Sequence, residues 1–371
     1  MDLHTLLIRS ADAGLEFLDD SEHMPAGHNG PYHDPETPVR NTAHWSITFL
    51  KAYQITDDDK YRDAATKCIS YLLSDEVRPY GETFRHRKTK KKDACNGLIG
   101  QAWTIEALAT VGGSLNWSEP LELAKSTFLR HPFDETLAAW KVVDIDGTIR
   151  GYDLTLNHQI WFAAAGALIL EHAEVTESVK KQVRKFLDEL NNNMYIYQSG
   201  IIYHNVRPKV DFRKYHKLSI ENTKRRRIPM PIIEVIRPET KLDLKQKSIG
   251  YQSFNLYALA LIYQLYPELD LWNSNEVTSS LDYSRTNSFK NSLENNEFAY
   301  PYNCTGIEMS YVNHVFNGKQ SEIRAWLSTQ FNRSYDLDSG LMRNETEDVE
   351  TLSARLYEAT RLPNIDRIFN Q

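Results

Sequence analysis

The sequence predicts an all-α fold in which six helical hairpins close into an (α/α)6 toroid. The first observation is a repeat, because Trp45, Trp103 and Trp161 are equally spaced and each lies in an apolar segment with helical periodicity. The second is that amphipathic segments with a charged face lie between the apolar ones. The third is that no run of alternating apolar and polar residues competes as a strand. Buried inner helices and half-exposed outer helices account for this pattern.

Six apolar segments are predicted to be the inner helices. The first three contain the tryptophans, the fourth follows after a longer gap, and the sixth is the weakest copy. In chain order they are 40–53, 97–110, 154–170, 249–266, 302–316 and 348–362. Six amphipathic segments are predicted to be the outer helices, of which the fifth is poorly patterned: 3–19, 61–74, 119–130, 176–193, 276–293 and 319–331.

A generic helical bundle or an open solenoid would use the same elements. The closed ring is favoured because six units are the number that closes it. In such a ring, the starts of the inner helices and the loops before them share one end. Polar and aromatic residues at these starts are therefore predicted to line a single cleft.

Composition indicates a soluble globular protein with one domain over residues 1–371, of which 41% are hydrophobic and 25% charged. No apolar stretch reaches the length of a membrane span, and the acidic N-terminal segment favours a helix over a signal peptide. Cys68, Cys95 and Cys304 are too few and too widely spaced for a disulfide framework or structural zinc. We therefore predict a reduced, cytoplasmic protein, and leave its oligomeric state open.

Familiar cofactor and nucleophile motifs are not found in the sequence. It contains no P-loop, no Rossmann glycine pattern, no GxSxG and no HExxH. The loop 22–37 carries three histidines and an aspartate, but their spacing matches no zinc motif. We predict no cofactor and no metal, and we expect His33 in this loop to contact substrate.

The repeat also predicts sugar-binding residues near the starts of the inner helices. The polar position lies two residues before the aromatic one, and His44 takes the neighbouring place in the first copy. The predicted hydroxyl-binding side chains are His44, Gln101, Gln159 and Gln252. The tryptophans have two interpretations, as platforms that stack on sugar rings or as supports between neighbouring helices: Trp45, Trp103 and Trp161.

Carboxylates and histidines near these starts are candidates for catalysis. Glycoside cleavage needs a proton donor and a second carboxylate, whereas epimerisation needs bases that take a proton from carbon. Asp153 and His158 stand at the start of the third inner segment, and Asp93 precedes the second. Asp153 has a structural interpretation as a helix cap, and Asp93 as a counter-charge for nearby lysines.

A further candidate carboxylate is Glu308, at the polar position of the fifth inner segment. Tyr302 and Tyr311 lie nearby and are predicted to contact substrate, because a Tyr–Glu pair suits proton transfer on uronic acids. The alternative interpretation of Glu308 is a paired carboxylate in the core.

Two basic segments stand out against the net charge of −7 of the chain. The segment 205–248 holds 13 Lys/Arg against five Asp/Glu, and RHRKTKKK at 85–92 carries six positive charges. Both precede an inner-helix start, so they are predicted to form a lid or rim that attracts an anionic carbohydrate. Nucleic acid, a partner protein, an anionic membrane surface or a plain solvated loop are the alternatives, and nucleic acid is not expected.

At this point the sequence resembles the (α/α)6 carbohydrate-active enzymes. GQAW at 100–103 is similar to the inner-helix motif of unsaturated glucuronyl hydrolases, although Ile99 stands where those enzymes usually carry Arg. The layout is also similar to N-acylglucosamine 2-epimerases and glucuronyl C5-epimerases. The ending 335–362 and LNHQIWFAAAGAL resemble proteins of prokaryotic surface-glycan and archaeal N-glycosylation gene clusters. Neither the Asp pair of the hydrolases nor the His pair of the 2-epimerases finds a match.

These observations and the resemblance together predict an enzyme acting on an anionic, uronate-containing glycan. Hydrolysis or lyase-type cleavage through carboxylate acid/base chemistry is the leading expectation. A uronyl C5- or 2-epimerase or isomerase is the second, and a non-catalytic glycan-pathway scaffold or binding protein is the third. Fold alone does not separate them, because one scaffold hosts many chemistries.

Overall fold

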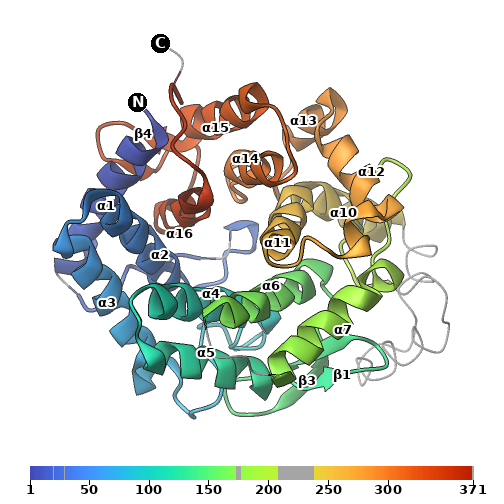
Figure 1. Cartoon of the computed structure of the whole chain (residues 1–371), viewed down its shortest axis with the longest axis horizontal. Helices are drawn as coiled ribbons and strands as arrows, with labels where there is room; N and C mark the ends of the chain where they lie inside the picture. Colours follow the sequence, from blue (N-terminus) through green and yellow to red (C-terminus); the bar gives the residue numbers. More distant parts are fainter. Residues whose placement is uncertain (20, 29, 173–176, 208–237, 370–371) are drawn as a thin grey trace.

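The computed structural model describes residues 1–19, 21–28, 30–172, 177–207 and 238–369, and these form a ring of helices in two concentric layers (Figure 1). The predicted (α/α)6 toroid is confirmed. Its inner layer consists of α2 (Val39–Thr56), α4 (Gly97–Ser114), α6 (Leu156–His172), α11 (Gln252–Leu265), α14 (Thr305–Val315) and α16 (Val349–Ala354), which η4 (Arg355–Arg361) continues as a 3-10 helix.

The outer layer follows the predicted amphipathic segments. It consists of α1 (Leu3–Asp19), α3 (Asp59–Leu73), α5 (Ser118–Arg130), α7 (Glu177–Asn193), α12 (Asn275–Ser284) with α13 (Asn287–Leu293), and α15 (Gln320–Ser334). The poorly patterned segment 276–293 is thus two short helices. Thr286 separates them, because its hydroxyl accepts the amide hydrogen of Phe289 and caps α13.

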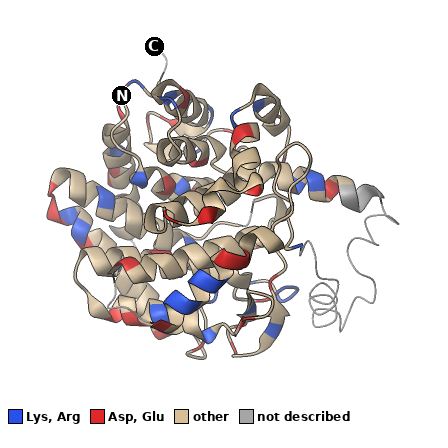
Figure 2. Cartoon of the chain, turned by 45° about the vertical axis from the view of Figure 1, so that its right-hand side comes forward, with Lys and Arg blue, Asp and Glu red and all other residues tan. Residues whose placement is uncertain are grey.

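The two layers differ in burial as their sequences predict. In α7 the buried apolar residues recur on one face, as Val179, Val183, Phe186 and Leu190. In α4 nearly every residue is buried, which matches its uniformly apolar sequence. Lys, Arg, Asp and Glu accordingly lie mostly on the outer helices and the loops (Figure 2).

The ring is closed by contacts between neighbours. From α2 to α14 each inner helix contacts the next, and η4, which continues α16, contacts both α14 and α2. The described ends of the chain lie side by side, because the Leu3 amide donates to the Ile365 carbonyl. The assignment of residues 1–371 to one domain stays a prediction, since 208–237 lie outside the described residues.

A few short strands accompany the helices, although no run of alternating residues stood out in the sequence. β1 (Phe133–Asp134), β2 (Ala139–Val143) and β3 (Ile149–Tyr152) make a small antiparallel sheet, and β4 (Tyr335–Asp336) pairs with β5 (Leu341–Met342). The turn at Asp146–Gly147, with Gly147 at φ +82°, joins β2 to β3, and this Asp-Gly signal was present in the sequence.

The remaining described elements are α10 (Pro238–Gly250), η1 (Gly30–Tyr32), η2 (Asp75–Val77) and η3 (Asp270–Asn273). All three cysteines are buried free thiols. Within the described ranges, no helix is long and apolar enough to cross a membrane.

Candidate active site

A cavity of about 180 Å³, the inner cavity, opens at the end of the ring where the inner helices begin. Five inner elements each contribute a lining side chain near their N-terminal end: Arg40, Trp103, His158, Phe254 and Arg355. The single cleft predicted from the repeat therefore exists in the described chain. Side chains from several loops, the first at Tyr32 and the last at Asn303, complete its wall.

A second cavity of about 600 Å³, the outer cavity, adjoins the first. Arg87, Lys92, Thr155 and His158 line both, so the two spaces meet at these residues. The outer cavity is lined by the basic loop 85–92 on one side and by residues 150–155 on the other. His158 stands at their boundary.

Asp153 and His158 form a hydrogen-bonded pair at this boundary. His158 Nδ1 lies 2.8 Å from Asp153 Oδ2, and the side chains are 23% and 9% exposed. Asp153 also accepts the amide hydrogens of Leu98 at 3.0 Å and Thr155 at 3.1 Å. Asp153 therefore both caps helix starts, as one interpretation expected, and orients a histidine.

The charge of Asp153 is stabilised in place. Burial alone would raise the pKa of Asp153, but His158 and the amides of Leu98 and Thr155 hold that pKa below its ordinary value. Asp153 can lie this close to the start of α4 because residue 97 is a glycine, with φ +58°. A Cβ at this position would lie 2.6 Å from Asp153 Oδ2. An ionised carboxylate only accepts, so His158 Nδ1 donates and Nε2 carries the lone pair.

His204 brings a second imidazole to the inner cavity. Burial, with His158 and Lys247 nearby, lowers the pKa of His204 to about 3, so its ring is neutral at physiological pH. Its Nδ1 is buried without a hydrogen-bond partner among the described residues.

Glu308 lies beneath the cavity rather than on its wall. It is fully buried, accepts from Arg355 Nη2 and Ser253 Oγ at 2.5 Å each, and does not line either cavity. Arg355 also pairs with Glu358 at 2.7 Å and donates to Asn303 Oδ1 at 2.6 Å. Burial raises the pKa of Glu308 and, to about 8, that of Glu358. The structural interpretation of Glu308 as a paired core carboxylate fits this position.

Arg40 supplies a second buried guanidinium to the inner cavity. It pairs with the buried Glu36 at 3.3 Å and lies over the ring of Trp103, 4.2 Å from its centroid. Trp103 is 5% exposed and lines the cavity, so it faces the arginine as well as the open space. His44 lies one layer deeper, stacked on Tyr357 at 4.1 Å, and burial lowers its pKa far below the ordinary value.

The three predicted glutamines brace loops instead of lining the cavity. Gln101 accepts the Phe84 amide and donates to the carbonyls of Phe84 and Cys95, all at 2.9 Å. Gln159 makes the same contacts to Trp140 and Asp153. Gln252 accepts the Ile202 amide at 2.8 Å. All three are fully buried, so their amides are unavailable to sugar hydroxyls.

Trp45, Trp161 and Tyr311 belong to the core as well. Trp45 is 1% exposed and covers Gly14 of the outer helix α1. Trp161 is 1% exposed and stacks on Phe254 with centroids 4.7 Å apart. Tyr311 is 4% exposed, and burial raises its pKa to about 12. Because no sugar ring can reach these aromatic faces, the supporting interpretation fits them.

Tyr302 separates the inner cavity from a third pocket. The Tyr251 hydroxyl donates to the Tyr302 hydroxyl at 3.2 Å, and Tyr302 lines the inner cavity. His33 lies on the other side of Tyr302, exposed, with its ring 5.0 Å from that of His28. Among the described residues no group of three or more His, Cys, Asp or Glu is placed to hold a metal.

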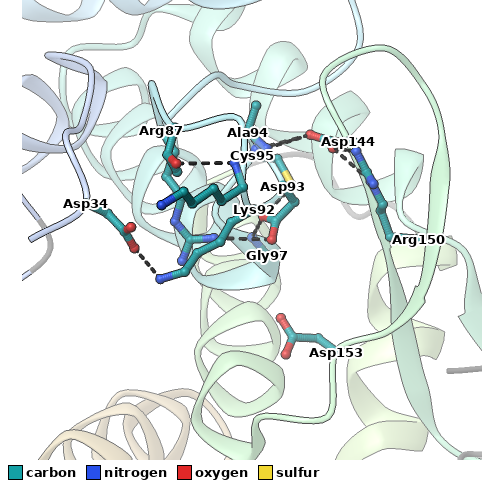
Figure 3. A network of polar contacts seen from close by, with 12 residues as sticks. Asp34, Arg87, Lys92, Asp93, Ala94, Cys95, Gly97, Asp144, Arg150 and Asp153 are labelled. Carbon is teal, nitrogen blue, oxygen red and sulfur yellow. Dashed lines mark hydrogen bonds and ion pairs between the residues drawn. The ribbon is translucent and has the colours of Figure 1, made fainter. Parts of the chain in front are cut away.

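Asp93 lines the outer cavity beside the basic loop (Figure 3). It accepts the Gly97 amide at 2.6 Å and an Arg87 hydrogen at 3.2 Å, so it caps α4 and neutralises an arginine of the loop. Of the other basic segment, 205–248, residues 208–237 lie outside the described residues, and the end of the segment is part of α10. Its proposed lid role is therefore untested.

Sequence reasoning missed the two buried arginines and Tyr251. Arg40 opens the first inner segment and Arg355 lies within the sixth, and a buried charge of this kind points to a paired or functional group. Glu358, three residues after Arg355, was the available signal for the second pair.

No family model matches the chain. Cellobiose 2-epimerase from Bacillus thermoamylovorans B4167 aligns with 94% of each chain at a TM-score of 0.62 and 11% identity. D-mannose isomerase aligns with 96% of each at 0.61 and 12%. The α-1,6-mannanase of Salegentibacter sp. HEL1_6 aligns with 97% of this chain and 98% of its own at 0.57 and 11%.

At these identities the three structures show a shared toroid and no more. The expected resemblance to toroidal sugar epimerases and to proteins of archaeal glycosylation is confirmed. Archaeal glycosylation protein Q of Haloferax volcanii is 42% identical over 366 residues, which are 98% of both chains. Such identity over nearly the full length means that the protein belongs to the family of archaeal glycosylation protein Q.

Proposed function

We propose that this chain is a sugar epimerase or isomerase that acts on an anionic, uronate-type sugar, with His158 as the base. The observation that carries the proposal is the Asp153–His158 pair at the mouth of a basic cavity. This reverses the order expected from the sequence, in which cleavage came first. Two of the similar structures are named as an epimerase and an isomerase, which supports the proposal that this scaffold carries such chemistry.

The chemistry follows from the geometry of the pair. Asp153 holds the Nδ1 hydrogen, so Nε2 of His158 takes the proton from a carbon next to the carbonyl or carboxyl group of the sugar. The imidazolium that forms is stabilised by the buried Asp153 charge. Return of the proton to the neighbouring carbon gives an isomer. An epimer forms when the planar intermediate turns its opposite face to the same imidazolium before the proton returns. Neither outcome needs an external oxidant or reductant.

Cations around the cavity suit the charge that develops. Arg40 and Arg355 are buried at its wall, and Arg87 and Lys92 stand at its mouth. A guanidinium binds a carboxylate in a bidentate manner and also stabilises an enolate-type oxyanion. The neutral His204 faces the same space and suits hydrogen bonding to a sugar oxygen.

Hydrolysis is the second candidate because two carboxylates, Asp93 and Asp153, line the outer cavity. A glycosidase needs one carboxyl group that is protonated near neutral pH and acts as the acid. Asp153 does not suit this role, since its pKa is lowered. Asp93 is engaged by Arg87 and the Gly97 amide. The inner cavity has no carboxylate among its described lining residues.

Proton NMR in D2O tests the proposal with a panel of uronic acids and neutral aldoses. We expect deuterium to enter a carbon-bound position of a uronic acid without cleavage, and His158→Gln to abolish the exchange. His172→Gln is the matched control, because His172 lies on the same helix, is also 23% exposed and also stands beside a carboxylate. New reducing ends or unsaturated sugars would overturn the proposal in favour of cleavage. Exchange that survives in His158→Gln would overturn the assigned base.

A further inference from the structure

We propose that the outer cavity is a phosphate subsite, so that the sugar processed at His158 is carried on a phosphate or pyrophosphate group. This inference rests on the proposed function and adds the substrate class. Because a phosphate at C1 blocks the sugar carbonyl, it applies to the epimerase form of the reaction, in which the proton is taken from C5 next to the carboxylate. It starts from the charge of the wall. Five basic side chains line the outer cavity against only two carboxylates: Arg87, Lys90, Lys91, Lys92 and Arg150.

The two arginines are held in fixed orientations. Arg150 donates to Asp144 Oδ2 through Nε at 2.9 Å and Nη2 at 2.5 Å, and Asp144 is itself buried. Arg87 donates to Asp93 at 3.2 Å (Figure 3). A guanidinium has five N–H groups, so each arginine keeps donors for a ligand while its position is already set.

Two lysines add charge that the described chain leaves unpaired. Lys90 and Lys91 are exposed at the rim and have no ion pair with any described residue, whereas Lys92 pairs with Asp34. Lysine is a compact point charge that binds phosphate oxygens from any direction. Two unpaired lysines and two oriented arginines on one cavity wall match the spread charge of a phosphate ester.

The backbone fixes the loop that carries these lysines. The amides of His86 and Arg87 both donate to the Ala94 carbonyl, at 2.8 and 2.9 Å, which closes residues 86–94 into a loop. The Lys88 amide donates to the Pro35 carbonyl at 2.9 Å. Lys90 and Lys91 therefore project from a loop whose base is anchored, which lowers the entropy that is lost when they are ordered on a ligand.

The position of the subsite matches a linked sugar. The outer and inner cavities meet at Arg87, Lys92, Thr155 and His158, so a phosphate in the outer cavity places its attached sugar beside His158. A uronate carboxylate carries one negative charge, which the arginines of the inner cavity can bind. The further cations of the outer cavity call for a second anionic group. A nucleoside diphosphate and a polyisoprenyl phosphate both supply it.

Calorimetry on the full chain tests the subsite directly. Inorganic pyrophosphate, glucuronic acid and glucuronic acid 1-phosphate are titrated into the wild type, Lys90→Gln/Lys91→Gln and Lys180→Gln/Lys181→Gln. The last is the matched control, since it removes two adjacent exposed lysines from the outer helix α7. We expect the wild type and the control to bind the 1-phosphate at least about tenfold more tightly than the free acid. The Lys90/Lys91 variant should lose most of this preference and bind pyrophosphate weakly.

Two further ligands distinguish the sources of the phosphate. UDP-glucuronic acid and a polyisoprenyl-phosphate glucuronide in detergent micelles are compared with the 1-phosphate, and the tighter of the two identifies a soluble or a lipid carrier. Equal affinity for glucuronic acid and its 1-phosphate, or an equal loss in the control, would overturn the phosphate subsite. So would a short single-stranded RNA that binds more tightly than every sugar phosphate and requires Lys90 and Lys91.

The subsite and the proposed reaction can fail separately. If Lys90→Gln/Lys91→Gln loses pyrophosphate, but no sugar in the NMR panel and neither glucuronic acid 1-phosphate nor UDP-glucuronic acid exchanges deuterium, the subsite stands and the epimerase or isomerase assignment falls. If free glucuronic acid exchanges deuterium in a His158-dependent way and phosphate brings no affinity, the reaction stands and the subsite falls.

Discussion

His158 donates its Nδ1 hydrogen to Asp153 Oδ2 across 2.8 Å, and the same oxygen accepts the amide hydrogen of Leu98 at the start of α4. One oxygen thus joins the second and third inner helices and fixes the tautomer of the histidine. The positive end of the α4 dipole adds to the stabilisation of the carboxylate. The arrangement keeps His158 Nε2 available at the meeting point of the two cavities.

Asp153→Asn is predicted to lower the exchange rate at least roughly 100-fold, because the amide no longer stabilises the imidazolium. The rate is measured as deuterium incorporation under saturating substrate. Asp146→Asn, at an exposed turn between β2 and β3, is the control and should keep the wild-type rate. A rate in Asp153→Asn that equals the wild type would remove Asp153 from the mechanism.

The same substitution has a predicted signature in stability against pH. The pKa of Asp153 is lowered in the folded state, so its contribution to stability is present above the ordinary aspartate range and is lost as pH falls through the folded pKa. The difference in unfolding free energy between wild type and Asp153→Asn should be largest near pH 7. It should shrink below about pH 4. Denaturant unfolding at several pH values measures it, and a difference that is constant across this range would contradict the assignment.

Glu358 is predicted to act in the opposite sense. Burial raises its pKa from 4.5 to about 8. The stability that Glu358 contributes is therefore fully present below the unfolded-state pKa of 4.5 and is lost as pH rises through the folded-state pKa of about 8. Relative to Glu358→Gln, the wild type should lose stability between about pH 5 and about pH 8. Glu350→Gln, an exposed glutamate on α16, should leave the pH dependence of the wild type unchanged. Chemical denaturation across this range is the measurement.

The ring of His204 is predicted to stay neutral throughout the physiological range. Burial and the charges of His158 and Lys247 lower its pKa to about 3, so its imidazole signals should not move between pH 5 and pH 8. Heteronuclear NMR of the imidazole nitrogens, assigned by His204→Asn, follows them. A titration midpoint inside that range would contradict the neutral ring and make His204 a candidate for a second proton-transfer group.

Substitutions of Trp45 and Trp103 are predicted to affect different properties, the stability of the fold and the binding of substrate. Trp45→Phe should cost about 1–2 kcal/mol of unfolding free energy and leave KM unchanged, because Trp45 packs against Gly14 away from the cavity. Trp103→Phe should raise KM, because Trp103 lines the inner cavity and orients Arg40. Steady-state kinetics and denaturation on both variants check this. A raised KM in Trp45→Phe would return it to the substrate-binding residues.

Gln101→Ala is predicted to destabilise the fold by roughly 2–4 kcal/mol, since it leaves the Phe84 amide and two carbonyls without their partner in a buried place. Gln54→Ala, on the exposed end of α2, should change stability by less than about 0.5 kcal/mol. Thermal and denaturant unfolding give the comparison. A small loss in Gln101→Ala would show that the loop has other sufficient anchors.

The repeat in the sequence was enough to predict the toroid, because helical periodicity and uniform apolarity report burial directly. It also placed the cleft at the starts of the inner helices, where Trp103, His158 and Tyr302 now line a cavity. The depth of each side chain could not be predicted. Gln101 and Trp103 are two residues apart on α4, yet the first braces a loop and the second borders the cavity.

The buried charges escaped prediction for a related reason. Glu308 stood out in the sequence, but its partners come from segments far along the chain, Ser253 and Arg355. A single sequence gives no distance between such residues, so a core ion pair and a catalytic carboxylate look alike. Asp153 and His158, five residues apart, were expected at one helix start, and the structure adds the hydrogen bond between them.

The buried glutamines allow the loops of the ring to change independently of the helices. Gln101, Gln159 and Gln252 each fasten one preceding loop to their own helix, at Phe84, Trp140 and Ile202, so a loop can lengthen or change its charge without shifting the helices around it. The basic loop 85–92 lies between Phe84 and Gln101, and the long segment 205–248 lies between Ile202 and Gln252. Each charged segment thus lies between a residue that a buried glutamine holds and the helix that carries this glutamine. Evolution of substrate preference in such a protein can proceed one loop at a time.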